Sequence, residues 1–138
     1  MNMQPPILGA EKELIVGAET VIESDTPHGN RGVVFEDDGE TGYFYARDYT
    51  TPDRLFVDAL HIYNVKGVTD RNKPCRIRII WIRDFSAAAL MINLVPHAVF
   101  HFERRCSYAK DPFPDPDPST GWTHSKELLE TQDLFFPQ

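Results

Sequence analysis

Acidic side chains are concentrated in one short stretch of the sequence, where they could bind a cation or a basic partner. Four carboxylates fall within five residues and two tyrosines follow them; the six residues are Glu36, Asp37, Asp38, Glu40, Tyr43 and Tyr45. A calcium loop needs oxygen ligands at alternate positions over about a dozen residues, whereas these acids are adjacent. We therefore expect no metal here and interpret the six residues as a partner-binding site, with a solvated turn as the simpler alternative.

Histidine and cysteine spacing does not indicate a metal or catalytic centre. His97 and His101 are four residues apart, which on a helix would suit zinc. On a strand the same spacing separates them by about 13 Å, and we predict a strand. Cys75 and Cys106 are too few for a disulfide framework. Because no nucleophile lies in a recognisable catalytic context, the sequence predicts a non-enzymatic protein without cofactors.

Charge is unevenly distributed along the 138 residues, whose formal net charge is −7. Residues 1–70 hold 5 Lys and Arg against 13 Asp and Glu, whereas residues 71–110 hold 8 against 2. The basic residues near Trp81 are Arg76, Arg78, Arg83, Arg104 and Arg105. We expect these arginines to pair with acidic segments of the same chain. An acidic protein attracts basic partners, so we expect a protein partner, and neither nucleic acid nor a membrane.

Alternating apolar residues and turn signals predict an α+β domain, mainly one antiparallel β-sheet of about six strands. Residues 32–49 contain two strand-like runs around an Asp- and Gly-rich turn, the pattern of a β-hairpin. Further strands are expected over residues 13–23, 55–65, 75–83, 87–94 and 96–105. The Ala, Leu and Met content of residues 87–94 also suits a short helix, so that assignment is open.

We expect a single domain over residues 1–138, with less regular structure at its two ends. Residues 1–12 are interpreted as a flexible lead-in, and residues 109–123, rich in Pro and Asp, as an extended segment. Ser125 is predicted to cap a short C-terminal helix over residues 126–130, with Leu128 and Leu129 turned inward. The apolar tail that follows either docks on the sheet or forms an exposed terminus.

Several strings in the sequence resemble an uncharacterised bacterial family, the domain of unknown function DUF2251. They are VVFEDDGETGYFYA, DALHIYNV, WIRDFSAAALMIN and PHAVFHF, and the similarity extends over roughly residues 14–115. The family has an Asp-Gly turn where this chain has Asp84-Phe85. The resemblance implies no particular activity.

Small acidic bacterial proteins of this sort resemble immunity proteins, which are encoded beside secreted toxins. By that analogy we expect a cytoplasmic protein-binding module that neutralises a basic toxin encoded nearby. Neither a secretory signal nor an apolar run long enough to span a bilayer is visible. The alternatives are a ligand-binding protein or enzyme with a pocket near His61, Tyr63 and Trp81, and a homo-oligomer that uses the apolar tail.

Overall fold

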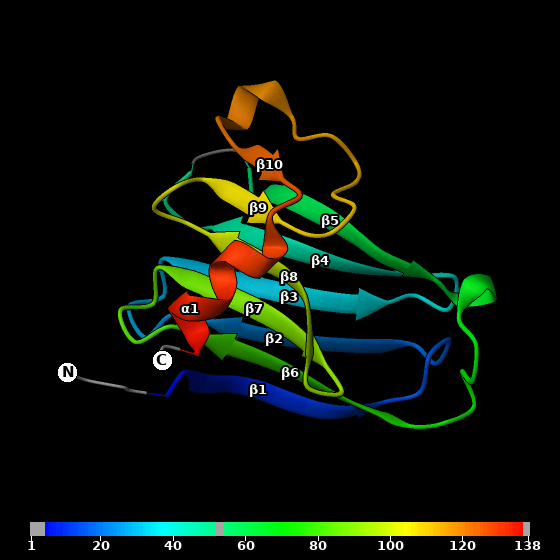
Figure 1. Ribbon diagram of the computed structural model, residues 1–138. Coiled ribbons are helices and arrows are strands. Elements are labelled where there is room, and N and C mark those ends of the chain that lie inside the picture. Colours follow the sequence, from blue (N-terminus) through cyan, green and yellow to red (C-terminus); the bar gives the residue numbers. More distant parts are fainter. Residues whose placement is uncertain (1–4, 52–53, 137–138) are drawn as a thin grey trace.

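The computed structural model describes residues 5–51 and 54–136, and in them ten strands form two sheets (Figure 1). The six-stranded sheet has the order β1 (Ile7–Leu14), β6 (Cys75–Trp81), β7 (Ala87–Ile92), β8 (Val95–His101), β9 (Cys106–Tyr108) and β10 (Thr123–Ser125). The four-stranded sheet has the order β2 (Thr20–Asp25), β3 (Arg31–Asp37), β4 (Thr41–Asp48) and β5 (Phe56–Asn64). The prediction of a mainly β domain is confirmed. The prediction of a single sheet with about six strands is wrong, because the ten strands form two sheets.

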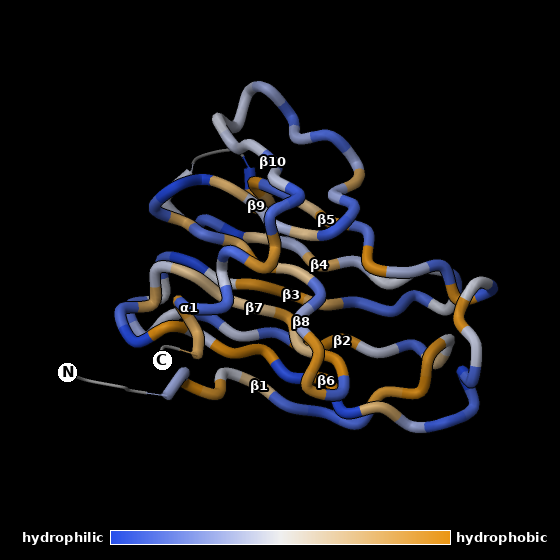
Figure 2. The backbone as a smooth tube through the Cα atoms, in the orientation of Figure 1, coloured by the Kyte–Doolittle hydropathy of each residue, from blue (hydrophilic) through white to orange (hydrophobic). Residues whose placement is uncertain are grey.

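Alternating residues of both sheets build one core between them. Phe35 of β3 lies opposite Phe44 of β4, and both side chains are fully buried. The Phe44 ring stacks on Phe100 of β8, with centroids 4.7 Å apart. Trp81 of β6 donates its Nε1–H to the Ser24 hydroxyl at 2.9 Å, which satisfies its buried polar atom. Figure 2 shows hydrophobic residues along β3 in the middle of the molecule, and hydrophobic and hydrophilic residues in turn along β6.

The N-terminal segment is an edge strand, so the expectation of a flexible lead-in over residues 1–12 is wrong where the structure describes it. β1 pairs antiparallel with β6, and its Glu11 carboxylate contacts Arg78 at 2.5 Å and Arg76 at 3.5 Å. These two arginines therefore pair with an acidic segment, as expected. Within the described residues Arg83, Arg104 and Arg105 form no ion pair, so the expectation is not met for these three. The strand predicted over residues 13–23 is divided into β1 and β2 by a turn at Gly17, whose φ of 95° suits glycine.

The middle of the chain follows the sequence pattern closely. Residues 87–92 form β7, which settles the open assignment as a strand, and β6 and β8 flank it on both sides. Phe85 in the turn before β7 has a φ of 62°. This is a left-handed conformation that glycine adopts freely and that residues with a side chain adopt less often.

The C-terminal part differs from the prediction after Pro118. The 3-10 helix η2 (Pro118–Thr120) interrupts the extended segment, and β10 then pairs in parallel with β9, a contact that the sequence pattern did not predict. The Ser125 hydroxyl accepts a hydrogen bond from the Glu127 amide at 3.0 Å, but residues 126–127 are not helical. The 3-10 helix η3 (Leu128–Thr131) and the short helix α1 (Gln132–Phe135) follow.

The C-terminal helices cover part of the six-stranded sheet on the face away from the core. Leu128 and Phe135 are buried there against Ala89, Met91 and Val99. Leu129 is 73% exposed, so the prediction that it turns inward is wrong. The apolar tail docks through Phe135, whereas its neighbour Phe136 is 43% exposed.

A buried polar cluster links the edge of the four-stranded sheet to β9 and β10. Asp58 of β5 and His124 of β10 have side chains 3% and 7% exposed, and Nε2 of His124 lies 2.8 Å from Asp58 Oδ2. The Ser107 hydroxyl of β9 donates to the same carboxylate oxygen. Within the described residues the buried Nδ1 of His124 has no hydrogen-bond partner. One carboxylate thus joins three strands from both sheets.

Replacing Asp58 with Ala should destabilise the protein by about 2–4 kcal/mol, because it leaves the Ser107 hydroxyl and the His124 ring buried without their partner. Urea unfolding measures the change. The matched control is Asp111→Ala at an exposed position, which should change stability by less than about 0.5 kcal/mol. Equal effects of the two substitutions would show that the buried cluster does not hold the sheets together.

Candidate functional site

The predicted β-hairpin forms from β3 and β4, but one of its four acids points into the protein. Asp37 lies on the same face of β3 as Phe35 and is 1% exposed. Its Oδ2 accepts hydrogen bonds from the Tyr63 hydroxyl at 2.6 Å and the Gly17 amide at 2.8 Å, and its Oδ1 accepts from the Gly39 amide at 2.8 Å. Asp37 is therefore a structural residue, and its assignment to the partner-binding site is not supported by its position.

The hydrogen bond between Tyr63 and Asp37 also changes the pKa of the tyrosine. Burial raises the pKa of Tyr63, and the bond to the Asp37 carboxylate raises it further. The Tyr63 hydroxyl is therefore protonated at neutral pH and stays a donor. This pair fastens the end of β5 to the end of β3, where the hairpin turn begins.

The other three acids remain at the surface around the turn. Asp38 is exposed, and its Oδ1 accepts from the Glu40 and Thr41 amides, each at 2.9 Å; these bonds hold the pKa of Asp38 below its ordinary value. Glu40 is exposed, and Glu36 is half-buried on the outer face of the sheet, opposite Tyr43. Within the described residues none of these three carboxylates forms an ion pair. We call Glu36, Asp38 and Glu40 the acidic rim.

Five aromatic rings form a continuous row on the outer face of the four-stranded sheet, the face turned away from the core. Neighbouring ring centroids lie 5.0 Å apart for Phe56 and Tyr45, 5.8 Å for Tyr45 and Tyr43, 5.4 Å for Tyr43 and His61, and 6.1 Å for His61 and Phe113. Phe56 is 41% exposed and Phe113 is 57% exposed. We call these five residues the aromatic row.

The sequence pattern predicted two members of the aromatic row and missed three. Tyr43 and Tyr45 alternate with the core residue Phe44, so their outward position follows from the strand pleat. Phe56 and His61 reach the row through pairing of β5 with β4. Phe113 reaches it because its carbonyl accepts a hydrogen bond from the His61 amide at 2.6 Å, a contact that no local pattern signals.

The alternative pocket near His61, Tyr63 and Trp81 is not assembled. The register of β4 and β5 shifts between Gly42 and Tyr43, so that Tyr63 lies opposite Gly42 and His61 opposite Tyr43. This bulge reverses the strand alternation: the His61 ring packs on Tyr43, and Tyr63 points inward to Asp37. Trp81 is 1% exposed inside the core. The three side chains therefore share no common cavity wall.

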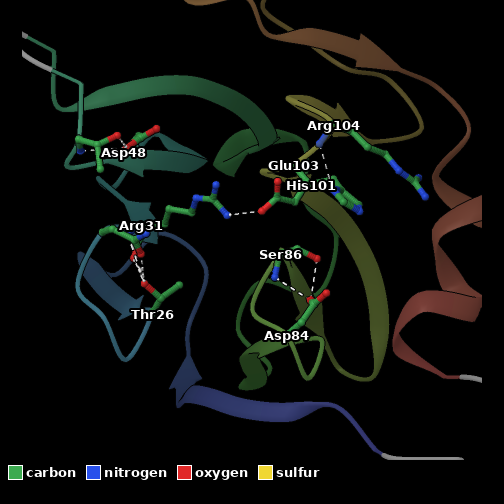
Figure 3. Close-up of polar contacts among 10 residues, drawn as sticks. Thr26, Arg31, Asp48, Asp84, Ser86, His101, Glu103 and Arg104 are labelled. Atoms are coloured by element: carbon green, nitrogen blue, oxygen red, sulfur yellow. Dashed lines mark hydrogen bonds and ion pairs between the residues drawn. The ribbon is translucent and has the colours of Figure 1, made fainter.

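A second polar cluster lies at the edge of the sandwich and connects the sheets there (Figure 3). Arg31 of β3 forms an ion pair with Glu103 at 3.1 Å, although the Glu103 side chain is 65% exposed. The Asp84 carboxylate accepts from the amide and the hydroxyl of Ser86, at 3.0 and 2.7 Å, and these bonds lower the pKa of Asp84. The Ser86 hydroxyl therefore already donates its hydrogen bond to Asp84. The bonds between Asp84 and Ser86 stabilise the turn that precedes β7.

The histidines do not assemble a metal centre within the parts of the chain that the structure describes, where no group of three or more His, Cys, Asp or Glu side chains could hold an ion. His101 is buried, and its Nδ1 accepts from the Arg104 amide at 3.3 Å. Burial and then the Arg104 charge lower the pKa of His101, and burial lowers the pKa of His97. Both imidazoles are therefore neutral at pH 7.

The buried cluster of Asp58, Ser107 and His124 has the residue types of a hydrolase triad but a different arrangement. In a triad the serine hydroxyl bonds the imidazole and is open to substrate. Here the Ser107 hydroxyl donates to the carboxylate instead, and Ser107 is fully buried. This cluster therefore presents no nucleophile.

Asp37→Asn should lower the free energy of unfolding by about 2 kcal/mol, because an amide group replaces an oxygen that accepts two hydrogen bonds in the interior. Because Asp37 is buried, the alternative of a fully solvated turn, considered from the sequence, does not hold for this residue. Asp38→Asn is the matched control, since its remaining oxygen can still accept both turn amides, and its effect should stay below about 0.5 kcal/mol. Thermal or urea unfolding that finds the two variants equally stable would contradict the structural role of Asp37.

Comparison with known proteins gives a family but no activity. The family model described as "Uncharacterized protein conserved in bacteria (DUF2251)" matches residues 14–135. An uncharacterized protein of Haemophilus influenzae is 38% identical over 120 residues, which cover 86% of this chain and 74% of that protein. No solved structure matches. In the described residues no helix is long and apolar enough to cross a membrane. On these matches the chain belongs to the DUF2251 family.

Proposed function

We propose that this protein is a cytoplasmic binding module that recognises a basic protein partner through the outer face of its four-stranded sheet, and that the partner is a toxin encoded nearby. The observation that carries the proposal is the position of the aromatic row beside the acidic rim. Glu36 lies directly opposite Tyr43 in the pairing of β3 and β4. Aromatic anchors supply most of the binding energy in many protein interfaces, and charged rims guide the partner toward them.

Ion pairs elsewhere in the protein leave the acidic rim as an uncompensated charge. On the same face, Arg47 pairs with Glu23 at 3.3 Å and with Asp25 at 2.8 Å. Arg76 and Arg78 are occupied by Glu11 on the other sheet. Burial raises the pKa of Tyr45, and the charges of Glu36 and Asp38 raise it further. Negative charge therefore acts on this ring of the aromatic row, and it favours a cationic partner surface.

Two further features support a binding surface over the alternatives. The apolar tail packs on its own chain: Phe135 is 2% exposed and lies against the six-stranded sheet. This reduces the case for a homo-oligomer built on the tail. The outer face of the four-stranded sheet carries exposed apolar side chains, with Val21 50% and Phe56 41% exposed. Val21 lies on β2 and Phe56 on β5, the two edge strands, and Tyr43 and Tyr45 lie on β4 between them.

The test is a pull-down with the product of the adjacent gene, followed by association and dissociation kinetics at two salt concentrations. Reversing the charges of the acidic rim (Glu36→Lys, Asp38→Lys, Glu40→Lys) should slow association about tenfold at low salt and reduce its salt dependence. Tyr43→Ala and Tyr45→Ala should each speed dissociation by about 30-fold, the effect of a hot-spot residue of about 2 kcal/mol. Charge reversal at the exposed Asp133 of α1, the helix that packs on the six-stranded sheet, is the matched control.

Two results would contradict this function. Failure of the chain to bind any neighbouring product, together with turnover of a small molecule, would favour an enzyme. A complex whose kinetics ignore both the acidic rim and the two tyrosines would place the interface on another surface.

A further inference from the structure

A hollow lies beside the aromatic row, at the edge of the four-stranded sheet. Its volume is about 250 Å³, and the side chains around it include Tyr45, Phe56, Ala59, Pro114 and Asp115. Ala59 lies opposite Tyr45 in the pairing of β4 and β5. Because alanine has only a methyl side chain, it leaves a gap between the larger neighbours.

The far wall of the hollow is held in place by the backbone. It belongs to the extended segment before η2, which runs along β5 where the His61 amide donates to the Phe113 carbonyl at 2.6 Å. Arg54, at the other end of the hollow, pairs with Asp117 of this segment at 2.9 Å. The wall therefore exists before any partner arrives, which reduces the ordering cost of binding.

The lining favours a cation over an anion or a purely apolar group. The Tyr45 and Phe56 rings lie 5.0 Å apart at an angle of 41°, and ring faces attract ammonium and guanidinium groups. The charges of Arg54 and Asp117 offset each other, whereas Asp115 is exposed and has no ion pair within residues 5–51 and 54–136. An apolar occupant would remove water from the Asp115 carboxylate without compensation.

The size of the hollow limits the occupant further. Pockets for whole small molecules occupy about 300–1,000 Å³, and this hollow is smaller. One long, thin side chain fits such a space, with its methylene groups against Ala59 and its charged end near Asp115.

We propose that the hollow receives a single arginine or lysine side chain of the protein partner. This inference rests on the proposed function and adds to it the kind of residue by which the partner is recognised. The aromatic walls bind the stem and the cation, and Asp115 gives preference to positive charge.

The inference can be tested without the partner by nuclear magnetic resonance, with short peptides as probes. Acetyl-Gly-Arg-Gly-amide and its lysine counterpart should cause saturable shifts of the Tyr45, Phe56 and Ala59 signals. The neutral peptide acetyl-Gly-Gln-Gly-amide should cause much smaller shifts. Ala59→Leu, which fills the hollow, should abolish the shifts, and Asp115→Asn should weaken binding several-fold. Asp111→Asn is the control, with an exposed acid removed outside the hollow.

Asp115→Asn changes an exposed side chain, so it tests the idea even if Ala59→Leu disturbs the sheet. Equal shifts with the glutamine and arginine peptides, or binding unchanged by both variants, would overturn the inference. The failure of the proposed function is a separate result: the peptides would still bind in the hollow, but no neighbouring protein would be captured. If a neighbouring protein is captured but the peptides cause no shifts, the proposed function stands, and the inference that the hollow binds an arginine or lysine side chain is wrong.

Discussion

Packing of the four-stranded sheet on the six-stranded sheet through Phe44 and Phe100 is the interaction on which the position of the aromatic row depends. The two rings stack at 4.7 Å in the centre of the core. Because side chains alternate along a strand, burial of Phe44 forces Tyr43 and Tyr45 to the opposite face of β4. The same residues that close the core therefore fix the aromatic row in place. A rigid strand gives such a surface more precise geometry than a loop would.

Acidic residues have two separate roles in this protein, and the negative net charge conceals the difference. Asp37 and Asp58 are buried and hold strands together through hydrogen bonds to Tyr63, Ser107 and His124. Such bonds matter because an unpaired buried polar group is costly. In the acidic rim Asp38 and Glu40 are exposed and Glu36 is half-buried, and within the described residues none of the three forms an ion pair. Removing acids from this chain can thus reduce stability or association rate, depending on the position.

Local patterns predicted the parts of the fold whose partners are near in sequence. The β3–β4 hairpin, the strand β6 and the outward position of Tyr43 and Tyr45 all follow from alternation over a few residues. Alternation along β3 places Asp37 on the same face as Phe35, but Asp37 is the last residue of the strand, beside an acidic turn. Its burial depends on hydrogen bonds from Gly17 and Tyr63, which are distant in the sequence. The formation of β1 could not be predicted, because it depends on pairing with β6. The position of Phe113 depends in the same way on its hydrogen bond to β5. These contacts join residues far apart in the chain, and composition does not encode them.

Hydroxyl-radical footprinting of the complex with the neighbouring gene product maps which aromatic side chains the partner covers. If the partner binds the aromatic row, Phe56 and Phe113, both exposed in the free protein, should lose reactivity in the complex, while Phe136 beside the six-stranded sheet stays reactive. Protection of Phe136 with Phe56 and Phe113 unchanged would show that the partner binds away from the aromatic row.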